Sequence, residues 1–182
     1  MKKFAVLFVL MLSVLLAACG APAEQWKAHE DVALGVKYET PESWVIKSEG
    51  GSISIADSQA TMDAQVLEKG AGVNLTTASL AEFGGIESPL ELLQFFTSFF
   101  AKSGEMTEVQ APTEVTIQGQ TAAKAVYEGT VEGQQGVFTV IVIAKDGRMA
   151  MVLGIEAGAE KTFTATLNRI LNSIVILPAA SN

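Results

Sequence analysis

The sequence has 182 residues, with 12 basic and 20 acidic side chains and a formal net charge of −8 at pH 7. This length is typical of a single domain with a sizeable hydrophobic core. The acidic balance lacks the basic surface that nucleic acids require, so we expect no nucleic-acid partner.

The N-terminal residues are arranged like an export signal. Lys2 and Lys3 precede an apolar run over residues 4–16 that only Ser13 interrupts, and small residues follow. The run has 13 residues, whereas a helix needs about 20 residues to cross a bilayer. We therefore predict a signal peptide rather than a permanent transmembrane helix.

The only cysteine of the chain, Cys19, directly follows this segment. The stretch Leu-Ala-Ala-Cys-Gly over residues 16–20 resembles the lipobox of bacterial lipoproteins. The resemblance implies that fatty chains such as palmitate are attached through the Cys19 thiol and that the chain is cut before it. An ordinary signal peptide with a chance cysteine, or an uncleaved anchor, are the alternatives.

These features predict a lipoprotein signal peptide over residues 1–18, a tether over 19–34 and a single domain over 35–178. Fatty chains on Cys19 would hold the domain on the extracytoplasmic face of the cell membrane. Loss of the two signal lysines changes the net charge from −8 to −10, so anionic head groups repel the body. Gly20 lacks the aspartate that retains lipoproteins in the inner membrane of enteric bacteria, which hints at the outer membrane in a cell with two membranes.

The predicted tether shows no sustained hydrophobic period over residues 20–34. Trp26 either packs on the domain or lies at the lipid interface. His29 is expected to be exposed to solvent in this stretch. It is the only histidine and lies in the predicted tether, away from other convergent polar groups, so a Ser-His-Asp triad and a two-histidine metal site are almost excluded.

Alternation of apolar and polar side chains predicts a β-meander in the first half of the domain. The expected strands cover residues 35–41, 44–46, 53–55 and 73–77. Pro41 must end the first of them. Residues 59–72 are ambiguous, with 64–67 as the only candidate strand.

The second half of the sequence predicts antiparallel hairpins. The expected strands cover residues 115–117, 123–131, 137–143 and 149–156. Asp146-Gly147 is typical of a two-residue hairpin turn. Since residues 137–143 are nearly all apolar and β-branched, we expect a central strand covered on both faces.

Two helices are predicted, one in the middle of the domain and one at its end. Ser88, Pro89 and Glu91 form a strong helix start, and Gly104 ends the helix. Apolar side chains at helical spacing over residues 158–174 predict the second helix, laid on the sheet. The fold class is therefore α+β, an antiparallel sheet flanked by helices.

Four phenylalanines, Phe95, Phe96, Phe99 and Phe100, lie on the first of these helices. Their wide apolar face fits a helix that the sheet covers. It also fits an apolar ligand pocket between helix and sheet. The sequence alone leaves both interpretations open.

The order of these elements, the stretch Tyr-Glu-Thr-Pro-Glu-Ser-Trp over residues 38–44 and the ending Leu-Asn-Arg-Ile-Leu-Asn-Ser-Ile over residues 167–174 resemble the PsbP-like superfamily. That superfamily also includes the Ran-binding Mog proteins. The likeness covers about residues 33–177 and implies an α/β/α sandwich that binds proteins or assists assemblies. It supplies no catalytic motif, and Cys19 is the only functional residue that a motif match identifies.

A search for reactive groups finds no convergent set, so we predict neither an enzyme nor a cofactor. Asp57, Asp63 and Asp146 are separated in the sequence, and the turn explains Asp146. A calcium site built from Asp57, Asp63 and neighbouring carbonyls stays an alternative, although we predict no metal. A hydrolase would need carboxylate or serine chemistry without a histidine.

The sequence therefore predicts a lipid-anchored, non-enzymatic binding or assembly module that contacts an envelope protein through a sheet edge or loops. The alternative is a carrier of a small apolar ligand with a pocket between the aromatic helix and the sheet. The sequence determines neither the oligomeric state nor the identity of a partner.

Overall fold

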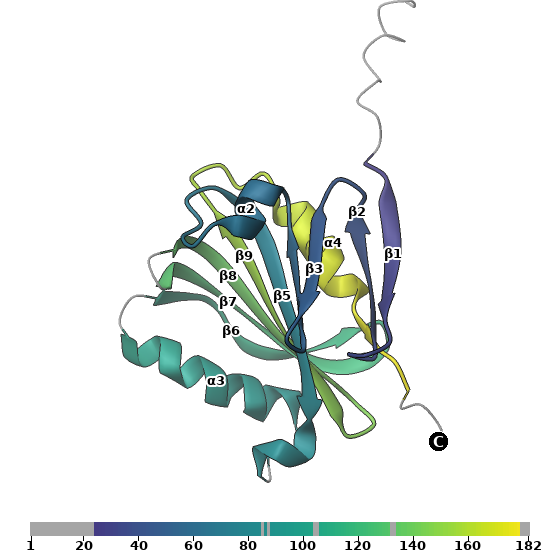
Figure 1. Ribbon diagram of the computed structural model, residues 1–182. Coiled ribbons are helices and arrows are strands. Elements are labelled where there is room, and N and C mark those ends of the chain that lie inside the picture. The colour runs from purple at the N-terminus through teal and green to yellow at the C-terminus, as the bar shows by residue number, and fades with distance from the viewer. Residues whose placement is uncertain (1–23, 85, 87, 104–105, 132–133, 179–182) are drawn as a thin grey trace, which may run out of the picture.

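The computed structural model describes residues 24–84, 86, 88–103, 106–131 and 134–178 (Figure 1). A seven-stranded antiparallel sheet lies at the centre, in the order β3-β4-β5-β9-β8-β7-β6. Its strands are β3 (Val45–Glu49), β4 (Ser52–Ala56), β5 (Gly70–Ser79), β6 (Met106–Ile117), β7 (Gln120–Val131), β8 (Gln134–Lys145) and β9 (Arg148–Ala157). The α+β class, an antiparallel sheet flanked by helices, is thus confirmed.

A small antiparallel sheet and three α-helices surround the central sheet within the described residues. The small sheet has the order β1-β2-β10, with β1 at Trp26–Asp31, β2 at Val36–Pro41 and β10 at Val175–Ile176. The helices are α2 (Gln59–Asp63), α3 (Pro89–Ser103) and α4 (Thr164–Ser173), and a 3-10 helix, η1, covers Leu80–Phe83.

Two tight turns set the register of the long hairpins. Gln118 and Gly119 join β6 to β7, and Asp146 and Gly147 join β8 to β9, with φ values of 50° and 74° in the first turn and 52° and 74° in the second. Positive φ at both central positions is typical of the type I′ turns that match the twist of a hairpin. The prediction of a turn at Asp146-Gly147 is confirmed.

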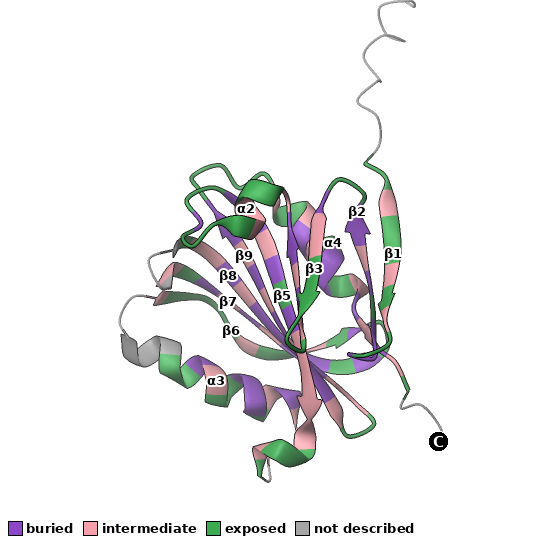
Figure 2. Cartoon of the chain, in the orientation of Figure 1, coloured by how far each residue is buried: buried purple, intermediate pink, exposed green. Residues whose placement is uncertain are grey.

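One face of the central sheet is covered by α4 and the small sheet together, and we call it the closed face. Its side chains include Ile53, Leu75 and Val152, all fully buried, and α4 contributes Ile170 and Leu171. Figure 2 shows that buried residues continue from the sheet into β2 and α4. Burial of this apolar surface is the main stabilising contribution to the fold.

Helix α3 packs on the opposite face, against β6, β7 and β8. Leu92 and Leu93 are fully buried there with Phe138 of β8. The predicted helix start is confirmed, because Ser88 Oγ accepts a hydrogen bond from the Glu91 backbone N–H at 3.1 Å. Strand β8 is covered on both faces as predicted, and its residues Val140–Ile143 are buried.

Polar side chains on the closed side connect distant segments. Gln120 donates from Nε2 to the carbonyls of Ile117 at 3.3 Å and Ile174 at 3.0 Å, and its Oε1 accepts from Ile176 N–H at 2.8 Å. Arg148 donates to the carbonyls of Leu34 and Leu177. These bonds hold the end of the chain against the central sheet.

The terminal helix is shorter than predicted, because residues 158–163 form an irregular entry to α4. The Glu156 carboxylate, 4 % exposed, accepts from Phe163 N–H and Thr164 Oγ1–H, each at 2.6 Å. It thereby satisfies an N–H at the start of a helix that has no side-chain cap of its own.

The tether prediction over residues 19–34 is wrong for part of its length. Strand β1 lies inside it and pairs antiparallel with β2, from Trp26 opposite Pro41 to Asp31 opposite Val36. The strand escapes prediction because it lies at an edge of the small sheet and buries little of its surface, which leaves a weak hydrophobic pattern. Trp26 packs against the core, and the Arg169 guanidinium lies 3.8 Å from the centre of its ring.

Two further expectations need correction. Residues 36–41 belong to the small sheet and do not start a meander with β3. The ambiguous stretch contains the short helix α2, and the candidate strand over 64–67 is absent from it. Ser58 begins α2, since its Oγ accepts from Thr61 N–H at 3.2 Å, which is a local signal that the hydrophobic period does not report.

Candidate functional site

Helix α3 covers only part of the face of the central sheet on which it packs, and the rest of that face lies beside the helix. Successive residues of β9 point to opposite faces, so Val152 is buried on the closed face while Met151, Leu153 and Ile155 are only partly buried on the other. These three side chains form an apolar stripe. Together with its neighbours on β3, β4 and β5 we call this surface the open face.

The neighbouring strands give the open face a polar half. Ile53 and Ile55 of β4 point into the closed face, so Ser52 and Ser54 point the other way, next to Asn74 of β5. Asn74 Nδ2 donates to Ser54 Oγ at 3.2 Å, and both side chains remain accessible. The open face therefore changes from apolar on β9 to hydroxyl and amide groups on β4 and β5.

Strand β3 forms the outer border of this polar half. Lys47 lies opposite Ser54 and Glu49 opposite Ser52. The Lys47 ammonium is 2.6 Å from the Glu49 carboxylate. This hydrogen-bonded pair raises the pKa of Lys47 and lowers that of Glu49, so both stay charged at neutral pH.

Helix α3 borders the apolar half with aromatic side chains. Phe95 is 50 % exposed and Phe99 is 55 % exposed, whereas Phe96 is partly buried against the core. Phe95 makes edge-to-face contacts with Phe96 and Phe99, with ring centres 5.7 and 5.4 Å apart, and Phe96 makes another with Phe83 of η1 at 5.8 Å. We call Phe95 and Phe99 the aromatic edge.

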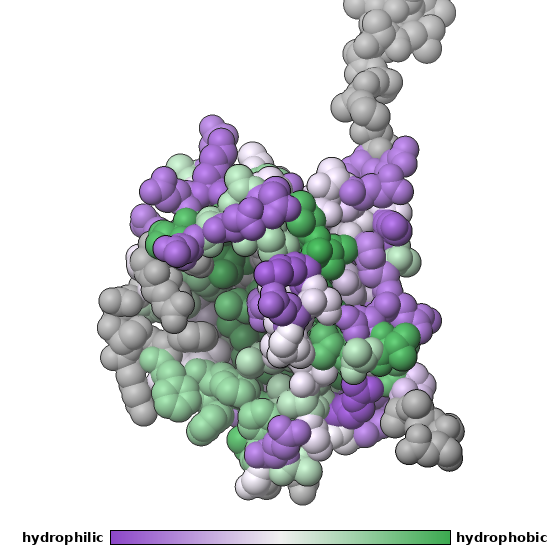
Figure 3. All heavy atoms as spheres, in the orientation of Figure 1, coloured by the Kyte–Doolittle hydropathy of each residue, from purple (hydrophilic) through white to green (hydrophobic). Residues whose placement is uncertain are grey.

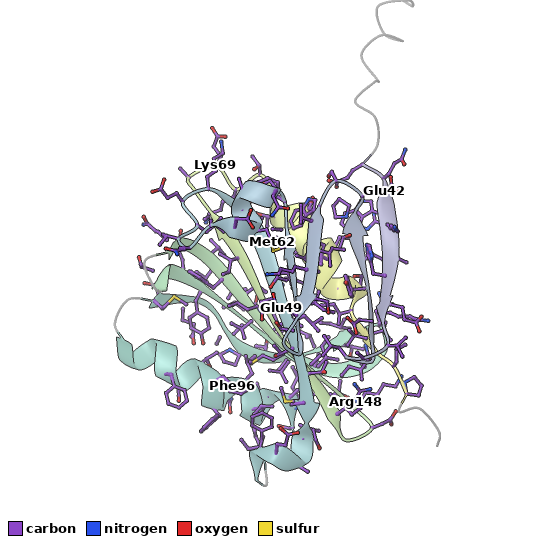
Figure 4. All side chains as sticks on the ribbon, viewed as in Figure 1. Glu42, Glu49, Met62, Lys69, Phe96 and Arg148 are labelled. Atoms are coloured by element: carbon purple, nitrogen blue, oxygen red, sulfur yellow. The ribbon has the colours of Figure 1, made fainter. Side chains whose placement is uncertain are left out.

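A hollow lies between α2 and α3. Figure 3 shows that its floor is hydrophobic and that hydrophobic residues also cover α3 beneath it, while Figure 4 shows Met62 and Phe96 on its two sides. The part under α2 has a volume of about 170 Å³. Its lining includes Met62, Asn74, Leu153 and Ile155, so α2 closes one end of the open face.

The structure describes the side chains of three of the four phenylalanines considered for a ligand pocket. Leu92 and Leu93 fill the space toward the sheet, while Phe95 and Phe99 lie on the surface. The side chain of Phe100 lies outside the described residues, as does Cys19. The assignments of a ligand pocket to the phenylalanines and of a lipid to Cys19 stay predictions.

A second hollow, of about 590 Å³, lies between the small sheet and α4. His29 lies in it and is not a free tether residue, because Nε2 is 2.9 Å from Thr40 Oγ1 and the ring stacks on Tyr38 at 5.3 Å. Partial burial, with a smaller contribution from Lys27, lowers the pKa of His29. Two surface ion pairs lie around it, Lys37 with Glu30 and Arg169 with Glu39, so these four charged groups already have partners.

A third hollow, of about 490 Å³, surrounds the entry to α4 and includes Glu128, Glu156 and Lys161. Each of these groups already has an internal partner. Lys161 Nζ is 3.4 Å from the Glu128 carboxylate, and Glu156 is bonded to the start of α4. The hollow thus contains groups that hold the fold together.

The carboxylates considered for calcium have separate structural partners. Asp57 Oδ1 accepts from Ala71 N–H at 3.3 Å, and Asp63 Oδ2 accepts from Gln59 Nε2 at 2.8 Å. Within the ranges that the structure describes, no group of three or more His, Cys, Asp or Glu side chains is placed to hold a metal ion. None of the described helices is long and apolar enough to span a bilayer.

No protein-family model and no curated protein matches the sequence. Solved structures do match. The solution structure of cyanobacterial PsbP (CyanoP) from Synechocystis sp. PCC 6803 has a TM-score of 0.56 at 12 % identity, covering 87 % of this chain and 96 % of that one. This chain has a PsbP-like fold.

Two further structures share the PsbP-like fold. LpqN, described as involved in cell envelope biogenesis of Mycobacterium tuberculosis, has a TM-score of 0.54 at 18 % identity, covering 86 % of this chain and 92 % of its own. PA94 from Pseudomonas aeruginosa, a protein of unknown function, has a TM-score of 0.51 at 10 % identity, covering 85 % and 99 %. At these identities the likeness concerns the fold alone.

Proposed function

We propose that this chain is a lipid-anchored, extracytoplasmic binding or assembly module that contacts an envelope protein and has no catalytic activity of its own. The open face is the surface that we assign to this contact. The single observation that carries the proposal is the pairing of the partly exposed stripe Met151, Leu153 and Ile155 with the exposed aromatic edge on α3.

Exposed aromatic side chains beside an apolar floor are typical of binding surfaces. Phe95 and Phe99 are about half exposed. Contiguous apolar surface of this kind marks interaction sites in soluble domains, and aromatic residues are enriched in protein interfaces. The open face therefore supports a binding role.

The proposed location rests on the signal residues and on one neighbour. Cys19 follows a lipobox-like sequence, and LpqN, which shares the fold, is described as involved in cell envelope biogenesis. Since β1 begins at Trp26, only seven residue steps separate it from Cys19, a reach of about 25 Å at full extension. The body would stand close to the membrane that holds the lipid.

The anchor itself is tested by lipid labelling. We expect labelled palmitate to be incorporated into the wild-type chain and to be lost in Cys19→Ser, because the thiol is the attachment point. Incorporation that survives the substitution would remove the anchor from the proposal.

The binding role is tested by cross-linking in intact cells. A photo-reactive amino acid placed at Phe99 is expected to give a discrete adduct with an envelope protein. The same group at Val32, which is 79 % exposed on the β1–β2 turn away from α3, is the matched control. Equal adducts at the two positions, or none at Phe99, would contradict a specific contact at the open face.

A further inference from the structure

We infer that the partner presents a basic, amphipathic α-helix, which lies on the open face beside α3. This inference rests on the function proposed above and names the chemistry of the partner segment. Three properties of the open face carry it: its width, the distribution of its polar and apolar groups, and its charge.

The width of the open face matches one helix. Among the described elements, α3 packs on β6, β7 and β8 and α2 contacts β4 and β5 at one end, which leaves the rest of β9, β5, β4 and β3 uncovered on that side of the sheet. Three spacings between these four strands amount to about 14 Å, and a helix with its side chains is about 10–12 Å in diameter. A second helix would thus complete the layer that α3 begins.

The groups on the open face fit an amphipathic helix. Apolar side chains of the helix would contact Leu153 and the aromatic edge, where the sheet is apolar. Its polar side chains would contact Ser54 and Asn74, which are accessible on the other half. An apolar helix stripe laid in a hydrophobic groove is a recurrent mode of peptide recognition.

The open face has two rims, one at α2 and β3 and the other at α3. The charges at both rims favour a basic helix. On the α2 rim, Lys47 is hydrogen-bonded to Glu49, and the Asp63 carboxylate also lies near it, so one cation faces two anions. On the α3 rim, Glu91 is exposed in the first turn, one helical turn before Phe95. None of the described cations forms an ion pair with Glu91 or Asp63.

The same charges and the position of the anchor disfavour two other occupants. A second copy of this chain would bring like charges together at both rims, which costs free energy. The anchoring bilayer would lie on the other side of the molecule, because the chain enters β1 at the end that carries α2, while α3 lies toward the opposite end (Figure 1). The aromatic edge therefore faces away from the proposed anchor.

The test uses stapled helical peptides of 15 residues, the length of α3. One has Leu on one face and Lys on the other, one has Leu and Glu in the same positions, and one has the Leu/Lys composition in scrambled order. They are titrated into residues 19–182 carrying Cys19→Ser, which retain every described element. We expect the amphipathic Leu/Lys peptide to bind at least about tenfold more tightly than either control.

Matched variants locate the binding. Leu153→Lys is expected to weaken binding of the Leu/Lys peptide about tenfold or more, while Val32→Lys, which adds the same charge elsewhere, leaves it unchanged. Asp63→Asn with Glu91→Gln alters only exposed groups and should weaken binding about threefold and reduce its dependence on salt. Thermal unfolding of each variant shows that the fold persists.

Several outcomes would overturn the inference. Equal affinity for the Leu/Lys and Leu/Glu peptides would contradict the charge argument. Full affinity in Leu153→Lys would show that the peptide does not bind at the open face. A dimer in sedimentation that Leu153→Lys dissociates, or a co-purified lipid in native mass spectrometry that this variant releases, would assign the face to another occupant. Phe99 adducts in cells without peptide binding would reject the helix and leave the proposed function standing, whereas absent adducts would reject both.

Discussion

The two faces of the central sheet differ more than their residues suggest. Val152 and Leu153 are neighbours on β9 and both are aliphatic, yet Val152 is fully buried on the closed face and Leu153 is partly exposed on the open face. The closed face has two covering elements, α4 and the small sheet, whereas α3 covers only part of the other. Apolar content therefore marks the core on one face and, under the proposed function, a binding surface on the other.

Polar groups follow the same division. On the closed side, Gln120 and Glu156 are almost completely buried and have hydrogen-bond partners within the chain. On the open side, Ser54 and Asn74 bond to each other and are still accessible. Polar side chains thus stabilise the closed face and leave hydrogen-bonding capacity on the open one, which a partner can use.

The largest expected effect comes from truncating the same residue type on each face. Leu171→Ala should lower the free energy of unfolding by about 2–5 kcal/mol, because Leu171 is 1 % exposed and its removal leaves a cavity. Leu153→Ala should cost about 1 kcal/mol or less, because its side chain is partly in water already. Urea unfolding monitored by tryptophan fluorescence measures both.

This pair tests the comparison directly. Gly154 lies beneath Leu171, and a Cβ atom added at Gly154 would lie 3.1 Å from Leu171 Cδ1, so α4 packs tightly where Leu171 is truncated. Equal losses of stability for the two alanine variants would mean that the open face is part of the core.

A smaller effect is expected at the entry to α4. Glu156→Ala removes both acceptors and leaves Phe163 N–H unsatisfied, which should cost about 1–3 kcal/mol. Glu156→Gln keeps one acceptor oxygen and the side-chain shape, so it should retain part of that stability. Thermal unfolding of the two variants gives the difference, and an alanine variant as stable as the glutamine variant would show that the bonds contribute nothing.

Local sequence patterns predict most elements of the fold. The Ser88 helix start, the Asp146-Gly147 turn and the apolar run of β8 depend on neighbours along the chain, and the structure contains all three. Strand β1 escapes such patterns because only its pairing with β2 defines it. The assignment of β2 to a separate sheet also depends on contacts between distant residues, which periodicity does not report.

The open face is harder to predict than the helix beside it. The four phenylalanines mark α3 as unusual, but periodicity does not say which of them the sheet covers, and Phe95 and Phe99 are the exposed ones. The stripe on β9 has the sequence of an ordinary buried strand. Whether a strand is covered on one face or both depends on how far α3 reaches across the sheet, which is a tertiary property.

The smallest expected effect is a loss of stability at acid pH that arises from His29 in the small sheet. Because burial lowers the pKa of His29 in the folded chain, the unfolded chain, with a histidine pKa of about 6.5, binds more protons as the pH falls. The contribution of neutral His29 to stability is therefore fully present above about pH 6.5 and is lost as the pH falls through its lower folded value.

The histidine is single, so one substitution isolates this effect. Wild-type stability should fall slightly between about pH 7 and about pH 5.5, a range that lies above the ordinary pKa values of carboxylates. His29→Gln should show a flatter profile in urea unfolding at the same pH values. The small sheet carries His29 and the open face does not, so peptide affinity should stay constant over this range, and a parallel loss of affinity would mean that the two faces are coupled.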